Sequence, residues 1–110
     1  MIKYSFFIFF FFFVNFSIHA ADKTWDAGGG DGLWGTAANW DLDEIPLAND
    51  NILIPTGVTV TLTGDFTTSG IFELEGTATM QMAGFNLTVG SLEANGNAVI
   101  NNSGALRNIT

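Results

Sequence analysis

The sequence predicts an all-β fold: a right-handed parallel β-helix of about three coils, each of roughly 20 residues, behind a tryptophan- and glycine-rich N-terminal cap. Glycines recur every twenty residues in the second half of the chain, at Gly64, Gly84 and Gly104. Between these glycines the apolar residues keep a common offset, as at Val60, Met80 and Ile100. Such a fixed spacing is typical of stacked solenoid repeats.

Short alternating runs indicate that the repeating elements are strands. Residues 58–62, 78–82 and 98–102 alternate with a period of two, which belongs to strands and not to helices. The side chains expected to point inward are Val60, Met80, Ile100, Leu62, Met82, Phe72 and Leu92. An antiparallel sandwich, which also has many short strands and turns, is the alternative fold.

Residues 1–20 are predicted to be a secretory signal peptide that is removed from the mature protein. A short basic segment with Lys3 precedes an apolar run over residues 6–14, and a more polar tail ends at Ala20, where we expect cleavage. A membrane anchor is the alternative, but spanning a bilayer takes about 20 apolar residues. We therefore expect a secreted or cell-surface protein that meets the membrane only transiently, through this segment.

Cleavage would leave a strongly acidic chain. Two cations, Lys23 and Arg107, would face eleven carboxylates, a formal charge of about −9. Nucleic acids and anionic membranes bind basic surfaces, so neither is an expected partner. An acidic surface also helps an exported protein to remain soluble.

Residues 21–51 are predicted to form the cap. They contain all three tryptophans of the chain, Trp25, Trp34 and Trp40, separated by glycines. In one interpretation the indoles close the first coil and hide its edge. In the other they form an exposed platform for sugar rings, because an indole combines an apolar face with a polar N–H. Residues 28–32 lack the G-x-G-x-x-G spacing and tandem calcium repeats, so we expect a flexible turn there.

Acidic side chains surround Pro46, just before the first coil. Asp41, Asp43 and Asp50 offer carboxylate oxygens, which are the ligands that calcium prefers. A solvated acidic loop without a metal is the alternative. Calcium is the one cofactor that the sequence suggests.

The predicted coils occupy residues 52–110. Since the chain has no cysteine, their stability must come from stacking of one coil on the next. Thr110 falls where Gly70 and Gly90 stand in earlier coils, so we expect the β-helix to continue in a longer chain. Glu73 and Glu93 share one offset, and two stacked carboxylates are expected to face the solvent.

Catalysis is not expected, and no residue is assigned a catalytic role. The single histidine, His19, lies in the predicted signal peptide, and without cysteine the mature chain can form neither a Ser–His nor a Cys–His nucleophile pair. Arg107 is the only cation in the coils. A glycosidase needs two carboxyl groups across a cleft, which three convex coils do not offer.

The tryptophan-rich segment resembles the start of known surface proteins. The string TWDAGGGDGLWGTAANW, followed by Pro46, residues 49–51 and ILIPTGVTVTL, is similar to autotransporter-associated β-strand repeat proteins and other secreted bacterial β-helical adhesins. The stretch from Trp40 to Gly76 also resembles the G8 domain of extracellular proteins. The resemblance covers roughly residues 24–76 and implies an architecture, but it carries over no catalytic residue. Unlike the tandem-repeat proteins, this chain has its tryptophan block once.

Together these features predict a secreted or cell-surface structural or adhesion protein that has no catalysis of its own. It would be the N-terminal part of a β-helix passenger, with host or matrix glycans or proteins as partners. The alternative is an extracellular, G8-like carbohydrate-binding module that uses Trp25, Trp34 and Trp40. A third hypothesis is the inert N-terminal part of a longer enzyme. Exposure of the indoles separates the first two, and sequence beyond Thr110 would identify the third.

Overall fold

The computed structural model describes residues 22–101 and 105–108, which consist mainly of strands and turns. The predicted signal peptide lies outside the described residues. The described strands are β1 (Asp22–Thr24), β2 (Asn51–Ile54), β3 (Thr59–Thr61), β4 (Phe66–Thr67), β5 (Ile71–Leu74), β6 (Thr79–Gln81), β7 (Asn86–Val89), β8 (Ser91–Ala94), β9 (Val99–Asn101) and β10 (Ala105–Asn108). Two 3-10 turns of three residues each, η2 (Ala37–Asn39) and η3 (Asp41–Asp43), are the described helical elements. The all-β prediction is confirmed.

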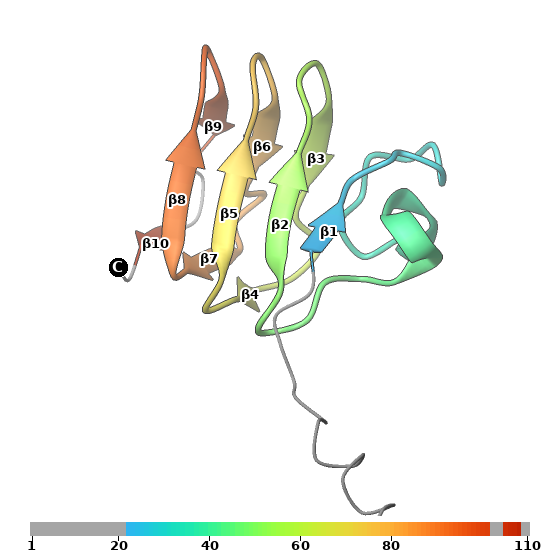
Figure 1. The fold of residues 1–110 in the computed structure, drawn as a ribbon, viewed down its shortest axis with the longest axis horizontal. Coiled ribbons are helices and arrows are strands. Elements are labelled where there is room, and N and C mark those ends of the chain that lie inside the picture. Colours follow the sequence, from blue (N-terminus) through green and yellow to red (C-terminus); the bar gives the residue numbers. More distant parts are fainter. Residues whose placement is uncertain (1–21, 102–104, 109–110) are drawn as a thin grey trace, which may run out of the picture.

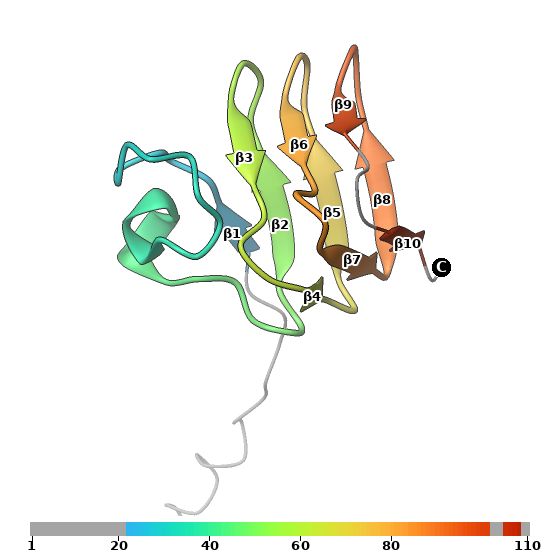
Figure 2. The ribbon, with the colours of Figure 1, turned by 180° about the vertical axis from the view of Figure 1, so that it is seen from behind.

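The strands form three parallel sheets. Their orders are β1-β2-β5-β8, β3-β6-β9 and β10-β7-β4, and every ladder between neighbouring strands is parallel. The chain visits the sheets in turn, so that β2–β4, β5–β7 and β8–β10 are three successive triplets (Figures 1 and 2). The antiparallel sandwich, the alternative fold, is wrong.

The strand register follows the glycine spacing in two of the sheets. Ile52 pairs with Phe72 and Phe72 with Leu92, at intervals of twenty residues. The third sheet departs from this interval, since Phe66 pairs with Leu87. The additional residue lies before β7, where Ala83 and Gly84 both adopt positive φ, 53° and 87°. A left-handed pair of this kind turns the chain tightly. Between the paired positions, the connection from β7 to β8 is one residue shorter than that from β4 to β5, so the twenty-residue interval returns where Phe72 pairs with Leu92.

The core lies between the three sheets. Val60, Leu62, Phe72, Met80 and Met82, from the predicted inward set, are at most 1% exposed. Ile100 and Leu92, from the third triplet, are partly buried and pack against this core. The alternation of buried and exposed residues in β2 and β5 is the period expected of strands with one face inward.

Side chains of the first triplet accept hydrogen bonds from backbone N–H groups of the second. Asn51 Oδ1 accepts from the N–H of Ile71 at 2.9 Å, and Asp65 Oδ1 accepts from that of Asn86 at 2.8 Å. Thr56 Oγ1 accepts from the N–H of Thr77 at 3.0 Å. These bonds satisfy backbone donors at the first residues of β5 and β7 and at the corner between β5 and β6.

The segment before β2 lies along the first triplet. β1 pairs with β2, and the N–H of Trp25 continues this contact by donating to the carbonyl of Leu53 at 3.0 Å. Beside the second sheet, the N–H of Trp34 donates to the carbonyl of Thr61 at 2.9 Å. In Figure 1 β1 and the helical turns are on the side of β2 away from β5 and β8. The segment therefore covers the backbone edge that β2 and β3 would otherwise expose.

Candidate functional site

The three tryptophans form one buried cluster. Trp25, Trp34 and Trp40 are 2%, 4% and 0% exposed. The ring of Trp40 meets Trp25 edge to face, with centroids 5.1 Å apart, and meets Trp34 at 4.9 Å. Trp34 also packs on Phe66 at 4.9 Å, which joins the cluster to the core of the first triplet. An edge-to-face arrangement is a favoured geometry for aromatic pairs.

The polar edge of the central indole is satisfied inside the cluster. Trp40 Nε1 donates to the carbonyl oxygen of Trp34 at 2.9 Å. The backbones of Trp25 and Trp40 form an isolated antiparallel bridge. Since neither the rings nor this N–H is open to solvent, the indoles offer no stacking face to a sugar in this conformation.

Asn39 holds the glycine-rich loop in place. This side chain is 0% exposed, and its Oδ1 accepts from the N–H of Gly29 at 2.8 Å. Its Nδ2 donates to Asp31 Oδ1 at 2.7 Å and to the carbonyl of Leu33 at 2.9 Å. The loop that the sequence suggested to be a flexible turn is therefore organised around one buried amide, which sequence reasoning missed.

The Asp31 carboxylate completes this loop. Thr36 Oγ1 donates to Asp31 Oδ2 at 2.7 Å, and the N–H of Leu33 donates to Asp31 Oδ1 at 3.0 Å. The hydrogen bond from Thr36, followed by those from Leu33 and Asn39, lowers the pKa of Asp31 below its ordinary value of 3.8. The carboxylate remains ionised at neutral pH, where it accepts bonds from three parts of the loop.

Lys23 is buried beside two acidic groups. Its Nζ lies 3.3 Å from Asp50 Oδ2 and 3.6 Å from Glu44 Oε1, and Lys23 and Asp50 are each 5% exposed. Asp50 Oδ2 also accepts from the N–H of Leu47 at 2.7 Å. The pair joins β1 to the start of β2, and the sequence analysis did not predict that these two residues meet.

The three residues predicted to bind calcium have different surroundings. Asp50 has the Lys23 ammonium beside it, and Asp41 Oδ1 accepts from the N–H of Thr24 at 3.0 Å. Asp43 is exposed and lies in a left-handed turn with φ of 53°. Across residues 22–101 and 105–108, no three His, Cys, Asp or Glu side chains are arranged to hold a metal ion. The structure therefore does not bring the predicted ligands together as a calcium site.

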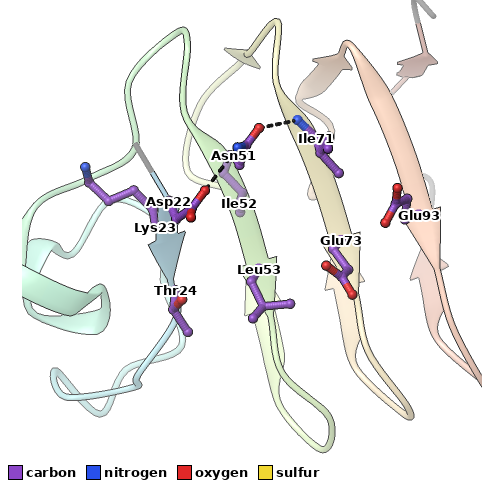
Figure 3. Close-up of a pocket in the computed structure, with 9 residues that line it drawn as sticks. All are labelled: Asp22, Lys23, Thr24, Asn51, Ile52, Leu53, Ile71, Glu73 and Glu93. Atoms are coloured by element: carbon purple, nitrogen blue, oxygen red, sulfur yellow. Dashed lines mark hydrogen bonds between the residues drawn. The ribbon is translucent and has the colours of Figure 1, made fainter. Parts of the chain in front are cut away.

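The outer face of the four-stranded sheet carries an open hollow of about 290 Å³ (Figure 3). Glu73 and Glu93 pair across β5 and β8, as the shared offset predicted, and their side chains lie on this face. Leu53 and Ile71 supply apolar surface beside them. The side chain of Lys23 extends away from the hollow, and its ammonium lies beside Asp50 and Glu44 instead of these carboxylates.

No described helix is long and apolar enough to cross a lipid bilayer. Comparison with known proteins found no matching family model, no matching curated protein and no matching solved structure. The features that bear on function are thus the buried tryptophan cluster, the ion pair at β1 and the acidic outer face.

Proposed function

We propose that this chain is the capped start of a parallel β-helix in a secreted or cell-surface protein with a structural or adhesive role and no catalysis of its own. In this proposal each strand triplet is one coil of a right-handed solenoid. Three parallel sheets visited in turn, with twenty-residue registers in two of them, support this assignment.

Burial of the indole cluster is the observation that carries the proposal. A solenoid needs a cover over its first coil, because an open edge of parallel strands would pair with other chains. Trp34 packs on Phe66 of the first triplet, and β1 pairs with β2. An aromatic cluster with 0–4% exposure stabilises such a cover by removing apolar surface from water.

The outer face of the β1-β2-β5-β8 sheet is the surface we assign to contact with a partner. Leu53, Ile71, Glu73 and Glu93 place apolar and acidic groups side by side in the hollow on this face. Binding surfaces commonly have apolar side chains at the centre and polar or charged groups at the rim, so we assign Ile71 to the centre and Glu73 and Glu93 to the rim. Host or matrix glycans or proteins are the partners proposed.

A binding assay with two matched variants tests this surface. Ile71→Ser changes a residue that is 39% exposed on the proposed face, whereas Val99→Ser changes one that is 45% exposed on β9, in another sheet. The proteins are titrated on immobilised matrix proteins and glycans. The proposal expects weaker binding for Ile71→Ser alone, and equal loss for both variants, or no binding by the parent protein, contradicts it.

The alternative, a G8-like carbohydrate-binding module, requires indole faces that a sugar can reach. Tryptophan emission with acrylamide quenching and a polysaccharide titration separates the two functions. Blue-shifted emission that resists quenching and ignores sugars supports a structural cap. Red-shifted emission that is quenched freely, and becomes protected on adding a glycan, supports the module and contradicts the cap.

A further inference from the structure

Asn95 and Gly96 form the one Asn–Gly dipeptide in the sequence. They occupy the corner between β8 and β9, and both residues are exposed. An asparagine followed by glycine has little steric protection, because the glycine has no side chain to keep its backbone nitrogen from the asparagine carbonyl. Solvent and base can therefore reach the dipeptide at this corner.

Glycine is structurally required at position 96. Its φ is 67°, in the left-handed region that disfavours residues with a Cβ. A Cβ at Gly96 would lie 3.0 Å from both the Cα and the carbonyl oxygen of Gly76 in the preceding triplet. A bulkier residue that would protect Asn95 is therefore strained at this position.

The backbone nitrogen of Gly96 lies between two backbone nitrogens that donate hydrogen bonds to the preceding triplet. The N–H of Asn95 donates to the carbonyl of Leu74 at 2.9 Å, and that of Asn97 donates to the carbonyl of Gly76 at 2.7 Å. Within residues 22–101 and 105–108, the N–H of Gly96 makes no hydrogen bond. It is thus available to lose a proton and act as a nucleophile.

We propose that Asn95 is a site of spontaneous deamidation. The deprotonated nitrogen of Gly96 attacks Cγ of Asn95, a C–N bond forms, and the side-chain amide leaves as ammonia, which closes a five-membered succinimide. Water then opens either carbonyl of the ring. The product is an aspartyl or an isoaspartyl residue at position 95, and no oxidant, cofactor or enzyme is needed.

The reaction would loosen the third triplet. Asn95 Nδ2 donates to Glu73 Oε2 at 3.3 Å, a bond that disappears when the amide becomes a carboxylate. The new negative charge lies beside Glu73, which already faces Glu93 across the strands. An isoaspartyl product also adds a methylene to the backbone between the two N–H groups that bind the second triplet.

Asp31 and Gly32 provide an internal comparison. Here too the second residue of the pair is glycine. The Asp31 side chain, however, is held by hydrogen bonds from Thr36 Oγ1 and Asn39 Nδ2, and an ionised carboxylate is a poor electrophile. We therefore expect position 95 to react well before position 31.

The experiment is incubation of the purified protein in mildly alkaline and mildly acidic buffer, followed by intact-mass measurement and peptide mapping. The proposal expects the mass gain of an amide-to-acid conversion, located at Asn95 and faster in alkali. Asn95→Gln is expected to abolish this conversion, whereas Asn97→Gln, at an exposed residue in the same corner, leaves its rate unchanged.

Absence of conversion at Asn95, or equal conversion at Asn97, overturns the proposal. Mapping of the parent protein gives this answer even if a variant fails to fold. The deamidated fraction is then separated by charge, and its urea midpoint is compared with that of unreacted protein. An unchanged midpoint refutes the proposed loosening of the third triplet.

Discussion

Replacing Trp40 with phenylalanine tests how much the indole cluster contributes to stability. Trp40 is 0% exposed and its Nε1 donates to the carbonyl of Trp34 at 2.9 Å. Phenylalanine leaves this buried acceptor without its donor, which costs about 1–3 kcal/mol. The lost ring volume, on the order of 40 Å³, adds about 1 kcal/mol if the void does not collapse. We therefore expect Trp40→Phe to lower the free energy of unfolding by about 2–4 kcal/mol.

This loss is large for a protein of this size, which has a total stability of roughly 5–10 kcal/mol. With a urea dependence of about 1.5 kcal/mol per M, the unfolding midpoint should fall by about 2 M. Circular dichroism in the far ultraviolet follows the transition without relying on tryptophan emission. Leu42→Ala, at a residue that is 80% exposed on the neighbouring turn, is the control and should change stability by less than about 0.5 kcal/mol. Equal midpoints for Trp40→Phe and the control would refute the reasoning.

Three further perturbations test the strand corners, the glycine-rich loop and the ion pair. Gly76→Ala should lower the free energy of unfolding by more than about 1 kcal/mol, because Gly76 has a φ of 56° and a new Cβ would meet Thr56 Oγ1. Gly64→Ala, where nothing lies within 4 Å of the new Cβ, should change the urea midpoint little, and equal effects of the two would argue against this corner geometry. The Asp31 carboxylate should stabilise the fold fully above its unfolded-state pKa, and this contribution should be lost as the pH falls through its lower folded-state pKa. Asp31→Asn removes this contribution, so the urea midpoint of the variant should fall less steeply with decreasing pH in the acidic range. Unchanged acid sensitivity in that variant would contradict the assigned hydrogen bonds. Lys23→Met should cost about 3 kcal/mol by leaving the buried Asp50 carboxylate without its ammonium, and adding Asp50→Asn should recover most of this loss in thermal unfolding. No recovery in the double variant would show that the lysine acts through something other than this pair.

The regular part of the fold was predictable because stacking leaves a direct trace in the sequence. Residues that pair across a parallel sheet occupy one environment, so Val60, Met80 and Ile100 remain apolar at a constant interval. The register of the third sheet was not predictable from that interval. There a left-handed turn at Ala83 and Gly84 accommodates one more residue, and a backbone conformation of this kind leaves only a weak signal in composition.

The cap was predictable as a location but not as a set of contacts. The three tryptophans predicted which segment forms the cap. The hydrogen bonds from Asn39 and the ion pair of Lys23 with Asp50 were not predictable, because the residues that they join are not separated by a repeating interval. The calcium hypothesis rested on carboxylates being near in sequence. In the structure, the N–H of Thr24 donates to Asp41 Oδ1, whereas Asp50 Oδ2 lies beside the N–H of Leu47 and the Lys23 ammonium, so the two carboxylates have different partners. The sparse lysines of an acidic chain were the one available hint that Lys23 has a specific partner.

The constant register has a consequence for how such a chain can change its length. Ile52, Phe72 and Leu92 follow one another across the first sheet at intervals of twenty residues. Removing or duplicating a block of that size would return every later side chain to the same face of its strand. A block of another length would move later residues out of register with the preceding triplet, unless a corner accommodates the difference, as it does before β7. A chain of this architecture can therefore gain or lose whole blocks of twenty residues, whereas smaller insertions are confined to corners such as Ala83–Gly84.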